Sequence, residues 1–332
     1  MRVLVTGASG NIGSAVVREL SAAEHEVLAV ARRRPVVPRT TAHSTVEWRC
    51  VDVSRDDLDD LVAGVDAVVH LAWKMQPTHR PEETWATNAV GTRRLLDAMA
   101  RSGTPALVCV SSVAAYSPVT HDDPVDETWQ TDGASSAAYC REKAYVERIL
   151  DAYEAASPGP RTVRIRPAFV FQRSAASEQR RIFGGPLARP AMFERRRIPV
   201  LPVPSGLRFQ AVHAGDVARA VCVAVTRPVS GAYNLAGGGI LDRPALGELV
   251  GARTFPVPPR VVRHAIDAAW TLRAAPVPGD LFSGLMGLPI MSTERARADL
   301  GWTPQHTGPQ ALAALFEGAA ARAGSGLPPL QP

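Results

Sequence analysis

A glycine-rich segment near the start of the chain, Gly7–Gly13 (GASGNIG), constrains the fold more than any other feature. It follows an apolar segment typical of a strand, Val3–Thr6, and precedes Ser14–Ala22, where apolar residues recur with helical spacing. Glycines let the backbone turn tightly and approach a pyrophosphate, and the following helix N-terminus offers unpaired N–H groups and a partial positive charge. Because it stands between a strand and a helix, we interpret this segment as a dinucleotide-binding loop rather than a plain tight turn.

Apolar segments alternate with helical patterns through the first half of the chain. The further expected strands are Glu26–Ala31, Val46–Val51, Ala67–Leu71, Ala106–Ser111 and Arg161–Arg166, and the expected helices between them include Asp56–Ala63 and Glu82–Arg101. Nearly continuous Val, Leu and Ala segments are typical of strands buried on both faces, and their alternation with helices indicates parallel βαβ units. We therefore predict an α/β fold with a doubly wound parallel Rossmann sheet that binds ligands at the carboxyl ends of its strands.

The sequence pattern changes after the last of these strands. Residues 172–208 are rich in Arg, Pro and Gly and lack clear periodicity, whereas Phe209–His213 and Ala232–Leu235 are expected to return to the sheet as late strands. Residues 240–332 are typical of helices with Pro-rich joints. The predicted division is a dinucleotide-binding Rossmann domain of residues 1–170 plus 209–238 and a smaller, mostly helical substrate-binding cap of residues 171–208 plus 239–332.

Composition argues against several classes of protein. The chain has no run of eighteen apolar residues and no apolar leader of secretory length, so we expect a cytoplasmic protein without membrane spans. The net charge of +5 permits an anionic partner, but aromatic residues are not interleaved with the Arg clusters, so nucleic-acid binding is not expected. The four cysteines include no CxxC pair, and His70, His79 and His213 stand alone, so we predict reduced structural thiols and no metal site.

One short segment, Ala137–Tyr145 (AAYCREKAY), carries one of only two lysines in a chain with 35 arginines. Its Tyr139 and Lys143 are four residues apart and would lie on one face of a helix. A free Tyr, with a pKa of about 10, is a poor acid–base group at neutral pH, and a neighbouring ammonium lowers that pKa. Arg would serve less well, because its planar guanidinium does not fit the same compact contact. We therefore predict that Lys143 tunes Tyr139 for proton transfer.

These motifs together resemble the extended branch of the short-chain dehydrogenase/reductase superfamily, which includes nucleotide-sugar epimerases and dehydratases and reductases of ketones and aldehydes. The glycine spacing GxxGxxG resembles that of this superfamily rather than the GxGxxG of other dehydrogenases. The resemblance covers most of the chain and implies an NAD(P)-dependent enzyme. The motifs that carry it are the glycine-rich segment, Asp52-Val53, His70-Leu71-Ala72, Asn88 with Gly91-Thr92, Ser111-Ser112, Tyr139 with Lys143, Arg166-Pro167, Val212-His213, Asp216-Val217 and Leu300-Gly301-Trp302.

The resemblance also implies roles for individual residues. The catalytic residues would be Ser112, Tyr139, Lys143 and Asn88. Ser112 would polarise a substrate carbonyl, and Lys143 would also hold the nicotinamide ribose. Asn88 would help to order the site, or would be a helix residue packed against the sheet. The residues implied to bind the cofactor are Gly7, Gly10, Asn11, Ile12, Gly13, Arg32, Asp52 and Val53 at the adenine, Leu71 and Ala72 on the path to the nicotinamide, Lys143 and Pro167.

The end of the second strand bears on the choice of cofactor. Relatives that use NAD carry an Asp there, which binds the ribose hydroxyls, whereas this chain reads Ala31-Arg32. An Arg can stack on adenine and pair with a 2′-phosphate, where a carboxylate would repel it. We therefore favour NADP(H) over NAD(H). In the other interpretation, Arg32–Arg34 opens a solvated loop.

Two departures from sugar-nucleotide epimerases bear on the substrate. Those enzymes carry an Asn shortly after the Arg of the sixth strand, whereas this chain carries Ala168 and Phe169 there. Phe209-Gln210 stands where they carry Arg-Asp, and Arg208, one residue off, would point to the opposite face of a strand. The candidate substrate walls are Trp73, Ser112, Phe169 and Phe171, with Met75, Phe282, Leu285 and Met286.

The sequence therefore predicts an NAD(P)-dependent oxidoreductase that interconverts a carbonyl and an alcohol on a small organic substrate, with Tyr139 moving the proton. One alternative is a nucleotide-sugar epimerase or dehydratase with a tightly held NAD, and another is a non-catalytic NADP-binding regulator. The Arg clusters at 180–181 and 195–197 keep an anionic substrate open. Pairing of two copies through the long helices, as in many relatives, is also left open.

Overall fold

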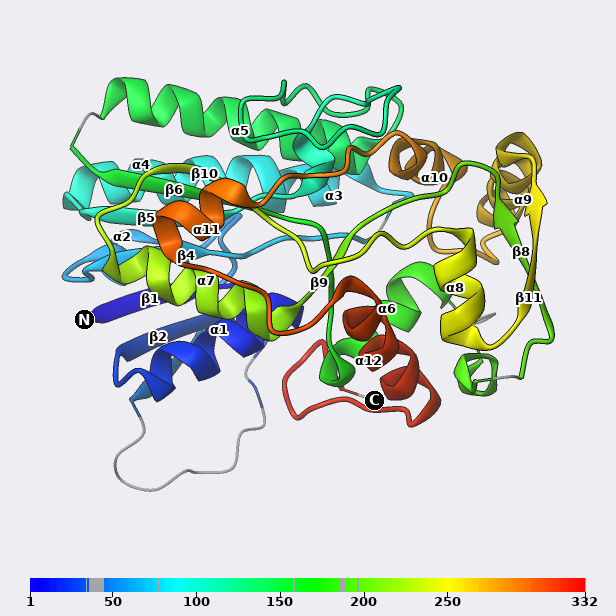
Figure 1. Ribbon diagram of the computed structural model, residues 1–332. Helices are drawn as coiled ribbons and strands as arrows, with labels where there is room; N and C mark the ends of the chain where they lie inside the picture. Colours follow the sequence, from blue (N-terminus) through cyan, green and yellow to red (C-terminus); the bar gives the residue numbers. More distant parts are fainter. Residues whose placement is uncertain are drawn as a thin grey trace.

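The computed structural model describes residues 1–33, 35, 45–76, 78–157, 159–185, 189–195 and 197–331. A seven-stranded parallel sheet lies at its centre, in the order β3–β2–β1–β4–β5–β6–β10, with helices on both faces (Figure 1). Its strands are β1 (Arg2–Thr6), β2 (Glu26–Ala31), β3 (Val46–Cys50), β4 (Ala67–His70), β5 (Ala106–Val110), β6 (Arg161–Pro167) and β10 (Gly231–Leu235). The predicted doubly wound sheet is confirmed. Its order reverses between β1 and β4, which is where open α/β sheets bind ligands.

The inner strands of the central sheet are buried on both faces, as β1 illustrates, whereas the edge strand β3 is partly exposed. Val3 and Val5 belong to one apolar cluster and Leu4 to another, because successive side chains of a strand point to opposite faces. An almost uninterrupted apolar segment therefore packs against two helix layers. The helices are α1 (Asn11–Ala22) and α7 (Ala214–Thr226) on one face, and α2 (Asp59–Val62), α4 (Gly91–Ser102) and α5 (Ala138–Ala156) on the other.

The predicted long helix Glu82–Arg101 is present, but its middle turn is a π-helix. The run consists of α3 (Pro81–Trp85), the π turn η1 (Ala86–Val90) and α4, with helical backbone angles at both joints. Such a wide turn is frequent at functional sites, and here it holds Asn88, which is fully buried.

A smaller group of elements, called the cap below, lies beyond the carboxyl ends of the strands, on the right of Figure 1. It contains two small parallel sheets, β7 (Phe169–Phe171) with β9 (Ala211–His213), and β8 (Val200–Pro204) with β11 (Arg253–Val257). Its helical segments are η3 (Arg173–Ala175), α6 (Ala176–Gln179), η4 (Arg180–Gly184), η6 (Pro190–Phe193), α8 (Arg243–Val250), α9 (Pro259–Thr271), α10 (Gly279–Met286) and α12 (Gly308–Ala320).

One predicted strand does not join the central sheet. β10 pairs with β6, as expected for Ala232–Leu235, but β9 pairs with β7. The prediction that Phe209–His213 returns to the central sheet is therefore wrong. The physical reason is that β10 already occupies the free edge of β6, so the backbone of β9 finds its hydrogen bonds outside that sheet.

The C-terminal part of the chain returns to the central sheet. Helix α11 (Glu294–Leu300) packs against α7 and β10, and Trp302 Nε1 donates to the Asp216 carbonyl oxygen at 2.8 Å. The buried Asp216 carboxylate accepts hydrogen bonds from the backbone N–H groups of Gln305 and His306. This segment therefore contacts the dinucleotide-binding side of the molecule, and the predicted division into two domains remains a proposal.

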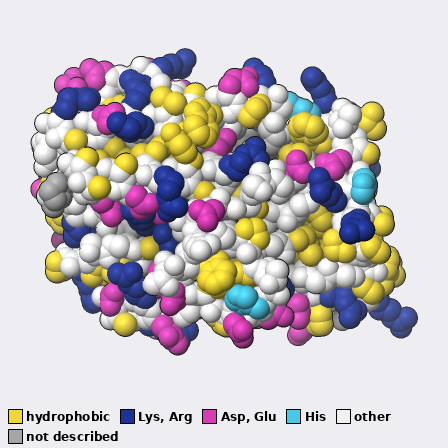
Figure 2. All heavy atoms as spheres, turned by 90° about the horizontal axis from the view of Figure 1, so that it is seen from above, with side chains coloured by type: hydrophobic (Ala, Val, Ile, Leu, Met, Phe, Trp, Pro, Cys, Tyr) yellow, Lys and Arg dark blue, Asp and Glu magenta, His cyan; other side chains and the backbone are white. Residues whose placement is uncertain are grey.

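The surface mixes charged and apolar side chains. Figure 2 shows the face seen from above Figure 1, where basic and acidic side chains are interspersed and hydrophobic ones gather in patches. Three of the exposed large apolar residues, Trp85, Val90 and Tyr145, belong to α3, η1 and α5, and the Trp85 and Tyr145 ring centroids are 4.6 Å apart. Within the described ranges, no helix combines the length and apolar character that crossing a membrane requires.

Candidate active site

The glycine-rich loop joins β1 to α1 where the strand order reverses. Gly7 has a φ of +67°, and a Cβ there would lie 2.6 Å from the backbone carbonyl carbon of Leu71. A Cβ on Gly13 would lie 2.1 Å from the Gly7 carbonyl oxygen, so neither position accepts a side chain. Helix α1 begins at the N-cap Gly10, which leaves its first N–H groups without a side-chain cap. This arrangement fits the pyrophosphate of a dinucleotide.

A cavity of about 260 Å³ opens beside this loop, at the carboxyl ends of the central strands. The predicted site residues that line it are Gly7, Gly10, Asn11, Ile12, Gly13, Leu71, Trp73, Met75, Ser112, Tyr139, Lys143, Pro167, Phe169, Phe171 and Leu285. The predicted residues outside its lining are Arg32, Asp52, Val53, Ala72, Asn88, Phe282 and Met286. The fold thus brings the glycine loop, the Ser-Tyr-Lys set and most of the expected apolar walls to one cavity.

Helix α5 turns one face toward the end of β5. Tyr139 and Lys143 lie on this face, as their spacing predicts, and both line the cavity with Ser112. Lys143 Nζ donates to the Val110 carbonyl oxygen at 3.2 Å. Ser112 is the N-cap of the short turn η2 (Val113–Ala115), and its Oγ accepts a hydrogen bond from that turn's backbone at 3.1 Å. The serine hydroxyl is therefore held in place before any ligand binds.

The acid–base state of Tyr139 differs from the prediction. Burial raises the pKa of Tyr139 to about 12, and the Ser112 hydroxyl beside it lowers that pKa only in part. The Lys143 ammonium faces Trp73 and the Val110 carbonyl. The predicted lowering of the Tyr139 pKa is not seen in this structure, and tuning of Tyr139 by Lys143 stays a prediction. Burial also lowers the pKa of Lys143 itself, to about 8.

Trp73 covers the ammonium of Lys143. Lys143 Nζ lies 3.5 Å from the centroid of the Trp73 ring, a cation–π geometry, and the same ring meets the Tyr139 ring edge-on with centroids 5.8 Å apart. Trp73 Nε1 is buried and has no hydrogen-bond partner among the described residues. Since buried N–H groups are usually paired, this one is available to a group bound in the cavity.

Asn88 lies behind the cavity rather than in its lining. Its Oδ1 accepts from the Lys74 N–H at 2.7 Å, and its Nδ2 donates to the Lys74 carbonyl oxygen at 2.9 Å and to Glu142 Oε2 at 2.6 Å. Glu142 also accepts from Thr84 Oγ1 at 2.6 Å. Asn88 therefore ties the segment that carries Trp73 to helix α5, without reaching the cavity itself.

The predicted adenine end lies outside the cavity lining. Arg32 follows β2 and is exposed, whereas Arg34 lies outside the described residues. No carboxylate ends β2, where Ala31 is buried. The Asp52 carboxylate accepts from the Ser54 N–H at 3.0 Å and from Ser54 Oγ at 2.6 Å, so it is held at the end of β3. These positions leave Arg32 accessible to a phosphate.

The cap supplies cavity residues that the sequence did not predict. Ile182, Phe183, Leu281 and Leu288 line the cavity, and Glu178 is the one carboxyl group among the described lining residues. Burial raises the pKa of Glu178 to about 7. No sequence signal identified these residues, because 172–208 lacks periodicity and an apolar residue of a cap helix cannot be told from a core residue before packing is known.

Arg208 precedes β9 and lies outside any strand, so its predicted direction stays a prediction. Its guanidinium pairs with Asp122 and donates to backbone carbonyl oxygens at 2.7 and 3.2 Å. Phe209, where sugar-nucleotide epimerases would carry Arg, packs against Phe169 of the cavity wall with ring centroids 5.1 Å apart. An aromatic pair therefore replaces a guanidinium at this position.

One group of potential metal ligands is brought together only by the fold. His213, Asp216 and His306 offer ligand atoms within 4.8 Å of one another, although His213 stands alone in the sequence. The Asp216 carboxylate already accepts from the Gln305 and His306 backbone and pairs with the His306 ring and with Arg219. Protein donors already occupy both carboxylate oxygens of Asp216, and one of these donors is the Arg219 cation. The group therefore fits a structural junction better than a metal centre.

The chain is similar to known proteins in sequence and in fold. The model described as the NAD dependent epimerase/dehydratase family matches residues 3–236. Over 328 residues the chain is 26% identical to the UDP-glucose 4-epimerase of Corynebacterium glutamicum, covering 92% of each chain. Over 186 residues it is 30% identical to the 2-alkyl-3-oxoalkanoate reductase of Stenotrophomonas maltophilia, covering 52% of this chain and 51% of that one. The crystal structure of Thermus thermophilus UDP-glucose 4-epimerase in complex with NAD is similar in fold, with a TM-score of 0.67 at 24% identity over 96% of this chain and 99% of that one.

Proposed function

Because the chain belongs to the NAD-dependent epimerase/dehydratase family, we propose that it is an NAD(P)-dependent oxidoreductase that interconverts a ketone or aldehyde and its alcohol. The family contains both epimerases and reductases, so the choice between them depends on the cavity rather than on the fold. The proposed substrate is a small, largely apolar carbonyl compound.

One observation carries this choice: Phe209 packs on Phe169 where an epimerase would hold a sugar diphosphate, while the Arg208 guanidinium is already paired with Asp122. Among the described residues that line the cavity, Lys143 is the only cation. A second diphosphate, beside that of the cofactor, would lack a counter-charge. Aromatic and aliphatic walls instead favour an apolar substrate, and similarity to a reductase of 2-alkyl-3-oxoalkanoates agrees with this proposal.

The proposed reaction needs few protein groups. Ser112 Oγ would donate to the substrate carbonyl oxygen, and Tyr139, protonated at neutral pH because its pKa is about 12, would pass its proton to that oxygen. The bound nicotinamide cofactor supplies the hydride to the carbonyl carbon, or accepts it in the reverse direction. Lys143 would hold the nicotinamide ribose, and the loop Gly7–Gly13 would hold the pyrophosphate. In oxidation the same proton returns from the alcohol to Tyr139.

The proposed cofactor is NADP(H). The exposed Arg32 at the end of β2 would pair with the 2′-phosphate, and Ala31 offers no carboxylate to hold the ribose hydroxyls of NAD. Asp52 and Val53 would lie at the adenine. Because a similar solved structure is named as a complex with NAD, this preference depends on Arg32 rather than on the fold.

The alternative function is a nucleotide-sugar epimerase or dehydratase. It is favoured by similarity along nearly the whole chain to a UDP-glucose 4-epimerase. Such an enzyme oxidises and re-reduces its substrate on a retained NAD, so it would need tight cofactor binding and a second diphosphate site.

We also propose that two copies pair through the helices that expose Trp85, Val90 and Tyr145. Apolar side chains of adjacent helices are removed from water when such faces pack together. Light scattering on the wild type and on Tyr145→Arg tests this: a dimer that the variant weakens supports the pairing, and a monomeric wild type contradicts it.

The function is tested by the cofactor that the purified protein holds and by its turnover. Nucleotide released by heat is identified by mass spectrometry, and the emptied protein is titrated with NADPH and NADH. Consumption of NADPH is then followed with a 2-alkyl-3-oxo ester and, separately, conversion of UDP-glucose is followed without added cofactor. An empty protein that oxidises NADPH with the ketone supports the proposal. Stoichiometric NAD with epimerisation of UDP-glucose would overturn it.

A further inference from the structure

Three side chains at four-residue intervals on α5 meet three consecutive residues at the end of β5. The contacts are Tyr139 with Ser112, Lys143 Nζ with the Val110 carbonyl oxygen at 3.2 Å, and Glu147 Oε1 with Ser111 Oγ at 2.6 Å. Residues spaced by four lie on one helix face, so the helix and the strand end are held in register. Ser111 lines the cavity together with the residues of the first two contacts, whereas Glu147 lies outside the lining and takes no part in the proposed chemistry.

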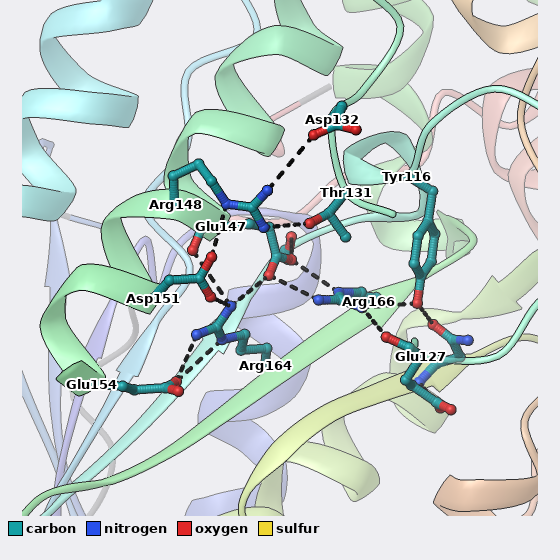
Figure 3. Close-up of polar contacts among 12 residues, drawn as sticks. Tyr116, Glu127, Thr131, Asp132, Glu147, Arg148, Asp151, Glu154, Arg164 and Arg166 are labelled. Carbon is teal, nitrogen blue, oxygen red and sulfur yellow. Dashed lines mark hydrogen bonds and ion pairs between the residues drawn. The ribbon is translucent and has the colours of Figure 1, made fainter. Parts of the chain in front are cut away.

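Glu147 is fully buried, and each of its oxygens accepts two hydrogen bonds. Oε1 accepts from Ser111 Oγ and from Arg166 Nε at 3.0 Å, while Oε2 accepts from Arg166 Nη2 at 3.0 Å and from Arg164 Nη1 at 3.1 Å. Figure 3 shows the carboxylate, which comes from α5, between the two arginines of β6. Burial raises the pKa of Glu147, but the Arg166 guanidinium opposes this and the pKa is about 2. The carboxylate is therefore ionised and saturated with donors at neutral pH.

The same arginine also holds the far end of the turn that begins at Ser112. Arg166 Nη1 donates to Tyr116 OH at 3.0 Å, as Figure 3 shows. Tyr116 is the C-cap residue of η2, and Ser112 is its N-cap. The turn is thus anchored on one side through Ser111 and on the other through Tyr116, and both anchors lead to the ion pair of Glu147 with Arg166.

We propose that Glu147 is a positioning residue: with Arg166 it clamps residues 111–116, so that the Ser112 hydroxyl stays in register with Tyr139. The inference rests on the proposed function, in which Ser112 polarises the carbonyl that Tyr139 protonates. Proton transfer and carbonyl polarisation require both hydroxyls to meet one substrate oxygen, and a displacement of about 1 Å can cost about a hundredfold in rate. Glu147 acts through Ser111 and Arg166 and touches neither substrate nor cofactor.

The test distinguishes loss of the clamp from loss of folding stability in the ion-pair network. Glu147→Gln leaves two buried guanidinium groups short of a partner and risks unfolding the chain. Ser111→Ala instead removes only the hydroxyl link and leaves both arginines paired with Glu147. Tyr116→Phe removes the other link. Glu154→Gln is the matched control, because Glu154 pairs with Arg164 at 2.8 Å on the outer side of the network and has no contact with the turn among the described residues.

Ketone reduction by the full-length protein gives the first readout. Ser111→Ala and Tyr116→Phe are each expected to lower kcat about tenfold or more, with KM and the NADPH Kd within about twofold of wild type and with folded protein retained. Glu154→Gln is expected to keep the wild-type kcat. Wild-type kcat in both link variants, or an equal loss in all three variants, would overturn the proposal.

Hydrogen exchange gives a second readout that does not need turnover. In peptides that cover residues 111–116, exchange is expected to rise about tenfold in the two link variants and to stay unchanged in Glu154→Gln, because only the link variants release the turn. If the wild type reduces no ketone, the proposed function fails. The exchange rates alone then test whether Glu147 and Arg166 clamp residues 111–116. Unchanged exchange in Ser111→Ala and Tyr116→Phe would overturn it.

Discussion

The ammonium of Lys143 lies 3.5 Å from the centroid of the Trp73 ring, and the same indole meets Tyr139 edge-on. Lys143 is 4% exposed, so the group proposed to hold the nicotinamide ribose is covered by an aromatic side chain. Both residues line the cavity, so we expect a ribose held by the ammonium to meet Trp73 as well. Cofactor binding is therefore expected to change the surroundings of Trp73.

Cofactor binding is expected to change the fluorescence of Trp73, because the indole exchanges a cationic neighbour for the nucleotide. Titration of the emptied protein with NADP⁺, which does not absorb tryptophan emission, measures the change. Trp73→Phe should lose most of it, whereas Trp85→Phe, exposed on α3 and outside the cavity lining, should retain it. The same signal in Trp73→Phe as in wild type would show that Trp73 does not respond.

Replacing Tyr139 by Phe is expected to lower ketone reduction about 10²- to 10⁴-fold and to leave the NADPH Kd unchanged, since only the proton donor is lost. The pKa of about 12 also predicts that Tyr139 stays protonated between about pH 6 and 9. At saturating cofactor, the wild-type rate should therefore show no loss in that range from Tyr139 ionisation. Tyr145→Phe, on the exposed side of the same helix, serves as the control. Wild-type turnover in the Tyr139→Phe variant would exclude Tyr139 as the donor.

The NADPH affinity is expected to fall as the pH rises through about 8. Burial lowers the pKa of Lys143 to about 8, so its ammonium is charged below that pH and neutral above it. Only the ammonium has three N–H donors and a positive charge to offer the ribose. Calorimetric titration at about pH 6.5 and about pH 9.5 measures the difference. Lys143→Met should bind more weakly at both pH values and show no such step, and a wild type without the step contradicts the prediction.

Arg32→Ala is expected to weaken NADPH binding about tenfold and to leave NADH binding unchanged, because the guanidinium would pair only with the 2′-phosphate. Arg33→Ala, a second exposed arginine one residue further on, is the matched control. Direct titration of each variant with both cofactors gives four dissociation constants. Equal losses for NADPH and NADH would place Arg32 away from the 2′-phosphate.

Glu178→Gln is expected to stabilise the protein above neutral pH. Burial raises the pKa of Glu178 from 4.5 to about 7, so between these values the folded state binds more protons than the unfolded state. The free energy of unfolding therefore falls as the pH rises through this window, on the order of 3 kcal/mol in all. Urea denaturation at about pH 5 and about pH 8 should show this loss in wild type and a smaller loss in the variant. Glu248→Gln, exposed on α8, should leave the wild-type pH dependence unchanged.

Most of the central sheet could be predicted from the sequence. Most of its inner strands are short apolar runs, as in β1, β2, β4 and β5, and the helices between them show regular spacing, so the signal lies within single segments. β9 was assigned to the wrong sheet because the choice of partner depends on which edge is free, and that edge is taken by β10, which comes later in the chain. The strands β8 and β11 were missed because their surroundings are rich in Pro and Gly.

The candidate site was predictable where its residues are close in sequence. The glycine loop and the pair of Tyr139 with Lys143 each lie within one structural unit, and the cavity brings them together. Asn88 was predicted from resemblance, but the π turn places it outside the cavity lining. Glu147 carries no local signal, because it lies on α5 and its partners come from elsewhere in the chain: Ser111 directly follows β5, and Arg166 lies in β6.

By itself, therefore, the sequence determined the parallel α/β sheet, the dinucleotide loop and the spacing of Tyr139 from Lys143, since each is encoded within a strand–loop–helix unit or a single helical turn. Only the tertiary structure decided that Tyr139 is half-buried with a raised pKa, that Lys143 faces Trp73 and that cap residues such as Phe183 wall the cavity. The reason is that burial and charge act through distances between segments far apart in the chain, and those distances exist only after the segments have packed.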